Sequence, residues 1–84
     1  MKKFQASITI TLRKGILDVQ GKAVENALHA IEFPMIENVR IGKFVELTID
    51  ADNAENAKLL VEDASKKLIA NPIIEDFIVK VNEI

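Results

Sequence analysis

Apolar and polar residues alternate over three stretches of this chain. The first stretch places its apolar residues at Phe4, Ala6, Ile8, Ile10 and Leu12. The later two place theirs at Val45, Leu47 and Ile49, and at Phe77, Val79 and Val81. A period of two residues is typical of a strand that buries one face. We therefore predict three strands at these places.

A shorter alternation precedes the second of these strands. Val39 and Ile41 are followed by Gly42-Lys43, which predicts a fourth strand joined to the next by a hairpin. A two-residue loop would place Val39 on the same face as Glu46 and so bury a carboxylate. We therefore expect a bulge at Gly42 that pairs Ile41 with Val45 and Val39 with Leu47.

Two segments have the spacing of helices. The first follows Asp18, a good N-cap residue, and its apolar residues are Ala23, Val24, Ala27, Leu28 and Ile31. We expect it to end before Phe33-Pro34. The second begins with a predicted capping box of Asp52 and Glu55 and ends at Asn71-Pro72. Its apolar residues are Ala54, Ala57, Leu60, Val61, Ala64 and Leu68.

The predicted element order is β-α-β-β-α-β over one domain of residues 1–84. This order predicts an α+β fold of the ferredoxin-like type, with two helices on one face of a four-stranded antiparallel sheet. The opposite face should carry Thr9, Thr11, Phe44, Thr48 and Ile78. Since these include exposed apolar side chains and the core is small, we expect a homo-oligomer, either a dimer or a tetramer.

Composition narrows the possible functions. The chain has no cysteine and a net charge of −2 with both signs interspersed, so thiol chemistry is excluded and neither nucleic acid nor a membrane is an expected partner. Because no apolar run resembles a signal peptide or a membrane span, we expect a soluble, cytoplasmic protein.

No common catalytic constellation is visible. The only histidine, His29, falls on the polar side of the first predicted helix without a nucleophile beside it. Glu75 and Asp76 are adjacent on a predicted strand, so their side chains point to opposite faces. The glycines form no phosphate-binding loop, although Arg13 and Lys14 before a helix N-terminus leave a weak anion site open. We expect no catalytic, cofactor or metal site in this chain.

Two other functions of the same topology need residues that the chain lacks, and a third stays open. Base-stacking aromatic residues, which an RNA-binding version needs on its central strands, are absent. A copper-chaperone version needs two cysteines after the first strand. A free-standing domain that senses a small ligand stays open, since the sites of such domains consist mostly of backbone and interface.

Three short motifs lie where a strand meets a helix. The first contains Lys14, Gly15, Leu17, Asp18, Gln20 and Gly21. The second contains Val39, Arg40, Gly42 and Lys43. The third contains Leu68, Ala70, Asn71, Pro72, Ile74 and Glu75. Together they resemble the PurS family, the small subunit of phosphoribosylformylglycinamidine synthase, from Phe4 to about Val81. Val19 stands where the family usually has proline, which only loosens the helix entry.

The resemblance implies a non-catalytic role in a catalytic complex of de novo purine biosynthesis. In the family, a glutaminase subunit releases ammonia from glutamine, and a large synthetase subunit uses ATP and magnesium to join it to formylglycinamide ribonucleotide. The small subunit holds the two together and assists ammonia transfer. This implies that the chain itself binds none of these compounds.

We expect the motif residues to act in contact with the partner subunits. The candidates are Lys14, Gly15, Asp18, Gln20, Gly21, Arg40, Gly42, Lys43, Asn71, Pro72 and Glu75. Lys14, Gln20 and Arg40 are the strongest of them, because Asp18 and Gly21 already have structural explanations as a cap and a close-packing residue.

Overall fold

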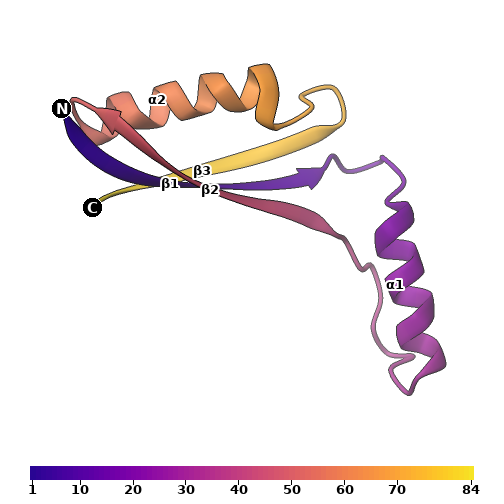
Figure 1. The fold of residues 1–84 in the computed structure, drawn as a ribbon. Helices are drawn as coiled ribbons and strands as arrows, with labels where there is room; N and C mark the ends of the chain where they lie inside the picture. The colour runs from indigo at the N-terminus through magenta and orange to yellow at the C-terminus, as the bar shows by residue number, and fades with distance from the viewer.

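Strand β1 (Lys2–Leu12) is the centre of a three-stranded antiparallel sheet. The computed structural model describes residues 1–84. In chain order, β1 is followed by α1 (Val19–Ala30), β2 (Gly42–Ala51), α2 (Ala54–Ala64), a π-helical turn η1 (Ser65–Ile69) and β3 (Glu75–Glu83). The strand order is β2-β1-β3, so both neighbours of β1 are edge strands (Figure 1). Neither helix is long and apolar enough to cross a membrane.

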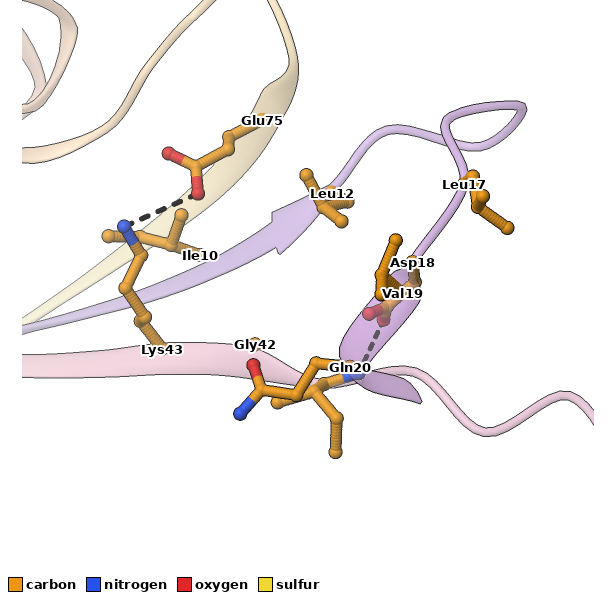
Figure 2. Close-up of a pocket in the computed structure, with 10 residues that line it drawn as sticks. Ile10, Leu12, Leu17, Asp18, Val19, Gln20, Gly42, Lys43 and Glu75 are labelled. Carbon is orange, nitrogen blue, oxygen red and sulfur yellow. Dashed lines mark hydrogen bonds and ion pairs between the residues drawn. The ribbon is translucent and has the colours of Figure 1, made fainter. Parts of the chain in front are cut away.

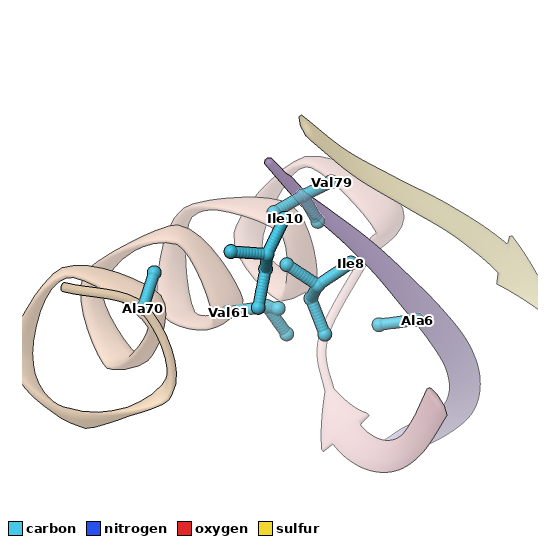
Figure 3. Packing of buried hydrophobic residues seen from close by; sticks show 6 residues of the cluster. All are labelled: Ala6, Ile8, Ile10, Val61, Ala70 and Val79. Atoms are coloured by element: carbon cyan, nitrogen blue, oxygen red, sulfur yellow. The ribbon is translucent and has the colours of Figure 1, made fainter. Parts of the chain in front are cut away.

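The alternation of β1 predicts its burial correctly. Phe4, Ala6, Ile8 and Ile10 are at most 1% exposed. They lie on the face covered by α2 and η1, where Ile8 and Ile10 belong to one cluster with Val61, Ala70 and Val79 (Figure 3). The same face receives Val45, Leu47 and Ile49 from β2. The three strands predicted from strict alternation are therefore confirmed.

The predicted fourth strand is wrong. Val39 to Ile41 lie outside any strand, and β2 begins at Gly42, so there is no hairpin and no bulge. Val45 is opposite Ile8 and Leu47 is opposite Ala6, rather than opposite residues 41 and 39. The reason is that the backbone N–H groups of Val39 and Ile41 donate to side-chain carboxylates of the α1 region, which replaces a strand ladder.

The prediction that both helices cover one face of the sheet is also wrong. Only α2 covers the sheet, whereas α1 projects beyond the end of β1 and β2 (Figure 1). α1 packs instead against residues 31–41, the return segment that leads back to β2. Near its C-terminal end, the Leu28 carbonyl accepts from the Phe33 N–H at 3.0 Å, and His29 Nε2 lies 2.6 Å from the Ile36 carbonyl oxygen. We name residues 13–41 the arm.

The start of α2 differs from its predicted capping box by one residue. The N-cap is Asn53, whose side-chain oxygen accepts from the Asn56 N–H at 2.7 Å. Asp52 lies one position too early to reach that amide. For α1 the predicted cap is confirmed, because the Asp18 carboxylate accepts from the Gly21 N–H at 2.7 Å.

The second helical segment buries fewer of its apolar residues than predicted, and its end is a π-helical turn. Ala57 and Val61 face the core, but Leu60 is 47% and Leu68 is 87% exposed, so the predicted place of both leucines on the apolar side is wrong. η1 holds more residues per turn than an α-helix, and the phase of the later side chains changes accordingly. Ser65 is fully buried there, and its hydroxyl donates to the Val61 carbonyl at 2.8 Å.

The other face of the sheet has no covering helix. Thr9 is opposite Phe44 on one side and Ile78 on the other, as predicted for this face. Phe44 and Ile78 are each more than 60% exposed. Ion pairs and hydrogen bonds such as Lys3 to Asp50 surround this row, so most of the face is polar.

Candidate functional site

The three sequence motifs converge at the end of the sheet from which the arm departs. A cavity of about 330 Å³ lies there, between the ends of the strands and the start of α1 (Figure 2). Asp18 and Gln20 come from the first motif, Gly42 and Lys43 from the second, and Glu75 from the third. The remaining lining residues are Ile10, Leu12, Leu17, Val19 and Ile41. The convergence joins positions up to 57 residues apart in the chain.

Asp18 ties the two connections of the arm together. One carboxylate oxygen accepts from the Gly21 N–H and the other from the Ile41 N–H, both at 2.7 Å. These backbone hydrogen bonds, that of Gly21 first, lower the pKa of Asp18, since they stabilise the ionised form. The side chain therefore caps α1 and fastens the return segment to it with the same group.

Glu75 occupies the opposite wall of the cavity. One of its carboxylate oxygens accepts from the Asn71 N–H at 2.7 Å, and the other lies 3.3 Å from the Lys43 ammonium. The Asn71 hydrogen bond and then Lys43 lower the pKa of Glu75. The Glu75 side chain is only 12% exposed. As predicted, Glu75 and Asp76 point to opposite faces, because their partners in β1 are Leu12 and Thr11.

At two glycines of the motifs, another stretch of backbone comes so close that a side chain would not fit. A Cβ at Gly21 would collide with the Val39 carbonyl oxygen, and one at Gly42 would lie 2.5 Å from the Ile10 carbonyl oxygen. The return segment therefore approaches both α1 and β1 only because these side chains are missing. Gly15 differs from both, since it has open space around it but a φ of +90°.

Arg40 holds the return segment against the end of β1. Its guanidinium donates to the Leu12 carbonyl, so this candidate has a structural contact within the chain. Lys14 and Gln20 take part in no side-chain hydrogen bond or ion pair and both are exposed. Of the three strongest candidates, only these two are free to meet another molecule.

Asn71 and Pro72 form the turn between η1 and β3. The Asn71 side-chain oxygen accepts from the Ile73 N–H at 3.1 Å, and its carbonyl accepts from the Glu75 N–H at 2.7 Å. The Pro72 carbonyl accepts from the Arg13 guanidinium. This turn therefore aims Glu75 at the cavity and joins β3 to the arm.

Two positioning residues were not among the partner-contact candidates from the sequence, where Arg13 was considered only for a weak anion site. Arg13 joins the Asn71-Pro72 turn to the end of β1 and also lies 3.5 Å from Asp76. Glu25 accepts from the Val39 N–H at 3.2 Å, and this bond leads the causes that lower its pKa. Glu25 follows Gly21 by four residues, so both lie on the same face of the helix. This spacing was the signal in the sequence that Glu25 faces the same segment as Gly21.

The charged side chains that line the cavity hold the arm to the end of the sheet, and we call this region the junction. Asp18 and Glu75 are ionised near neutral pH, because their pKa values are lowered, and both oxygens of each are engaged. No group of three or more acidic, histidine or cysteine side chains comes together to hold a metal ion. Proton transfer from either carboxyl group would first require one of these hydrogen bonds or ion pairs to break.

The fold and the junction define a class of small α+β proteins with a three-stranded antiparallel sheet and two helices. A family model described as PurS, phosphoribosylformylglycinamidine (FGAM) synthase, matches residues 5–83. The phosphoribosylformylglycinamidine synthase subunit PurS of Bacillus subtilis is 37% identical over 81 residues, which are 96% of this chain and 95% of that protein. The corresponding subunit of Methanocaldococcus jannaschii is 35% identical over 96% of this chain and 98% of its own.

Solved structures agree with these sequence relatives. A crystal structure of B. subtilis PurS has a TM-score of 0.85 at 38% identity and covers 95% of this chain and 99% of its own. A chain of the PurLQS structure from Thermotoga maritima has a TM-score of 0.85 at 28% identity over the whole of both chains. The chain belongs to the PurS family. It is thus a PurS subunit of FGAM synthase in purine biosynthesis, which favours this role over a free-standing ligand-sensing domain.

Proposed function

We propose that this chain is a non-catalytic assembly subunit, which bridges a glutaminase subunit and a large ATP-dependent synthetase subunit and assists the transfer of ammonia between them. The observation that carries this proposal is the convergence of the three motifs on one junction whose carboxylates are already engaged. Such residues shape a surface and leave no free acid or base for chemistry. The similarity to a chain of the T. maritima PurLQS structure supports a multi-subunit assembly.

The partner surface in this proposal is the outside of the junction. Lys14 and Gln20 are exposed there and make no polar side-chain contact within the chain, whereas Asp18, Arg40, Lys43 and Glu75 fix the loops that present them. The other motif residues, including Gly15, Gly21, Gly42, Asn71 and Pro72, then serve the shape of that surface. Loops held on a rigid scaffold are a common place for recognition.

The same proposal places the reactants elsewhere. We assign glutamine to the glutaminase subunit, and ATP and magnesium to the synthetase subunit, all of them working in the cytoplasm. In this proposal the chain itself binds no glutamine, ATP or magnesium. The chain itself acts as a homo-oligomer, a dimer or tetramer, for which the exposed apolar side chains of the arm provide support.

The test is reconstitution with the glutaminase and synthetase subunits of the same organism. Without this chain, synthesis driven by glutamine should fall to near background, whereas synthesis driven by added ammonium should persist, because only the transfer of ammonia depends on bridging. Equal glutamine-driven rates with and without the chain would contradict the assembly role. Loss of both rates together would contradict the bridging mechanism.

The surface is tested by replacing Lys14 and Gln20 together with alanine. Both side chains are exposed and free of polar contacts, so the fold should stay intact while binding to the synthetase subunit weakens. Lys66→Ala, at an exposed lysine of η1, is the matched control. Unchanged affinity of the Lys14 and Gln20 variant would remove this surface from the proposal.

A further inference from the structure

The cavity at the junction has an apolar floor that continues the core of the chain. Ile10 is 1% exposed and belongs to the buried cluster beneath α2, and Leu12 and Ile41 line the cavity with it. Leu17 and Val19 line the side towards α1 (Figure 2), and they are 74% and 69% exposed. Two large apolar side chains therefore flank an opening that leads to the core, where contact of apolar surface with water costs free energy.

The charged groups of this cavity are already compensated. Both oxygens of Asp18 accept from backbone N–H groups, and Glu75 accepts from the Asn71 N–H and lies 3.3 Å from the Lys43 ammonium. A charged ligand would have to break these contacts, because a buried charge needs a partner of its own. Gln20 is the one polar lining residue whose side chain makes no polar contact. An uncharged group with a single polar edge therefore complements the cavity.

The size of the cavity fits one large side chain. Its volume of about 330 Å³ is at the lower end of the range of about 300–1,000 Å³ for pockets that bind small molecules. A nucleotide would also bring phosphate groups, whereas the only cation of the lining, Lys43, is already paired with Glu75. An aromatic side chain buries about 150–250 Å² and, in tyrosine and tryptophan, carries one polar group at its edge. Such a side chain matches both the size and the chemistry of the cavity.

The other two hollows of the chain are less suited to an apolar group. The neighbouring hollow, of about 350 Å³, is lined by Lys22, Glu25 and Arg40 among others. The groove of about 570 Å³ between α2 and β3 is lined by Lys58 and Lys80 among others. Each of these two contains fewer apolar side chains than the cavity at the junction. We therefore restrict the inference to that cavity.

The walls of the cavity are fixed within the chain itself. Asp18 binds the Ile41 N–H, and the Arg40 guanidinium binds the Leu12 carbonyl, so the return segment is held against the end of β1. A preformed cavity binds a partner without the cost of ordering its own loops. In protein interfaces, large anchor side chains commonly fill such cavities inside a polar rim. Gln20 belongs both to this rim and to the partner surface proposed above.

We propose that an aromatic or large aliphatic side chain of the synthetase subunit inserts into this cavity, past Leu17 and Val19, and packs on Ile10. The Gln20 amide then forms a hydrogen bond with the segment that carries the inserted side chain. The insertion rests on the proposed function and deepens it. Lys14 and Gln20 define the partner surface there, and the cavity now specifies which kind of group that surface receives.

Truncation at the mouth of the cavity is the first test. Leu17→Ala combined with Val19→Ala should keep the fold, because both side chains are exposed, and the circular dichroism spectrum checks this. Affinity for the synthetase subunit, measured by titration calorimetry, should fall by about tenfold or more, since the surroundings of an anchor side chain contribute strongly to binding. Leu59→Ala, at a leucine of α2 that is 60% exposed and lines no cavity, is the matched control. Equal affinities of the two variants would overturn the insertion.

Photo-cross-linking identifies the inserted group directly, since the chain has no cysteine of its own. Leu17→Cys is labelled with a short alkyl diazirine and irradiated in the complex with the glutaminase and synthetase subunits. We expect a cross-link to an aromatic or large aliphatic residue of the synthetase subunit, in several-fold higher yield than from the control Leu59→Cys. A cross-link to the glutaminase subunit, to a second copy of this chain or to a charged residue of the synthetase subunit would overturn the insertion.

The outcomes also separate the insertion from the rest of the proposed function. If the variant of Leu17 and Val19 binds like the unchanged chain while the variant of Lys14 and Gln20 loses affinity, the insertion is overturned and the partner surface stands. If both variants bind like the unchanged chain, the partner surface and the insertion are overturned together. The role of bridging the other subunits is decided separately, by the reconstitution.

Discussion

The half of the molecule under α2 and the arm are held together by different forces. Under α2, fully buried side chains such as Phe4, Ile8 and Val61 pack between the helix and the sheet. In the arm, Gly21 is the only buried residue, and carboxylates of Asp18 and Glu25 hold the return segment through backbone N–H groups. The first half is stabilised by apolar burial, whereas the second is fixed by a few hydrogen bonds.

This difference explains how one small chain can be both stable and available for association. Apolar burial is cooperative and spread over many contacts, so the covered half can fold around its own core. Hydrogen bonds to backbone groups give the arm a defined shape and leave its apolar side chains free. The motifs collect where the two halves meet, so a change there alters the direction of the arm.

The largest expected effect is in the covered half. Ile8→Ala removes a side chain that is 0% exposed, and such truncations cost about 2–5 kcal/mol. A domain of this length has only about 4–12 kcal/mol of stability in total, so urea unfolding should shift to a much lower midpoint. Ile73→Ala, at a side chain that is 80% exposed, should leave it nearly unchanged. Equal shifts would show that the stability of the covered half does not come from the burial of side chains such as Ile8.

A change at Gly21 should loosen the arm and spare the core. Gly21→Ala places a methyl group against the Val39 carbonyl and the Asp18 carboxylate, and overpacking of this kind costs about 1–3 kcal/mol. The gain in helix propensity, at most about 1 kcal/mol, offsets part of it. Amide exchange at Val39 and Ile41 should accelerate while that of β1 stays slow. Asn26→Ala, on the exposed side of α1, is the control and should change neither.

Acid should open the arm before the core. Free aspartate and glutamate have pKa values of about 3.9 and 4.3, and backbone hydrogen bonds lower the pKa of Asp18 and Glu25 in the folded chain. Their stabilisation is therefore complete above those free values and disappears as the pH falls through the lowered ones. Protection factors of the Val39 and Ile41 amides should drop below about pH 4. Loss of core protection at the same pH would contradict two separate regions.

The smallest effect concerns the start of α2. Asn53→Ala removes the cap that accepts from the Asn56 N–H, which should cost about 1 kcal/mol. Asp52→Ala should cost almost nothing, since Asp52 is exposed and caps no amide. Thermal unfolding of the two variants measures the difference. A larger loss of stability for Asp52→Ala than for Asn53→Ala would instead support the capping box predicted from the sequence.

The sequence predicts most of the covered half because its signals are local. The strict alternation around Ile8 and the helical spacing around Val61 each bury one face, so strand, helix and core follow from periodicity. Prediction failed at Leu60, which is exposed within α2, and at Leu68, where a π-helical turn changes the phase of the side chains. Periodicity within one α-helix contains no information about such a turn.

The arm was harder to predict, because its shape depends on contacts distant in sequence. Val39 and Ile41 alternate like a strand, yet their amides are taken by Glu25 and Asp18, and no local pattern reveals that competition. The structure brings six of the motif residues, Leu17 among them, to one cavity. The pairing of Lys43 with Glu75 required the fold, since 32 residues separate them.

Hydrogen exchange of the isolated chain over a range of concentrations tests the central claim most directly. If the arm is organised for association, amides of α1 (Val19–Ala30) should gain protection as the concentration rises, whereas those around Ile8 in β1 should be equally protected throughout. The same dependence in both regions, or no dependence in either, would contradict the division of the molecule into a self-sufficient half and an arm organised for association.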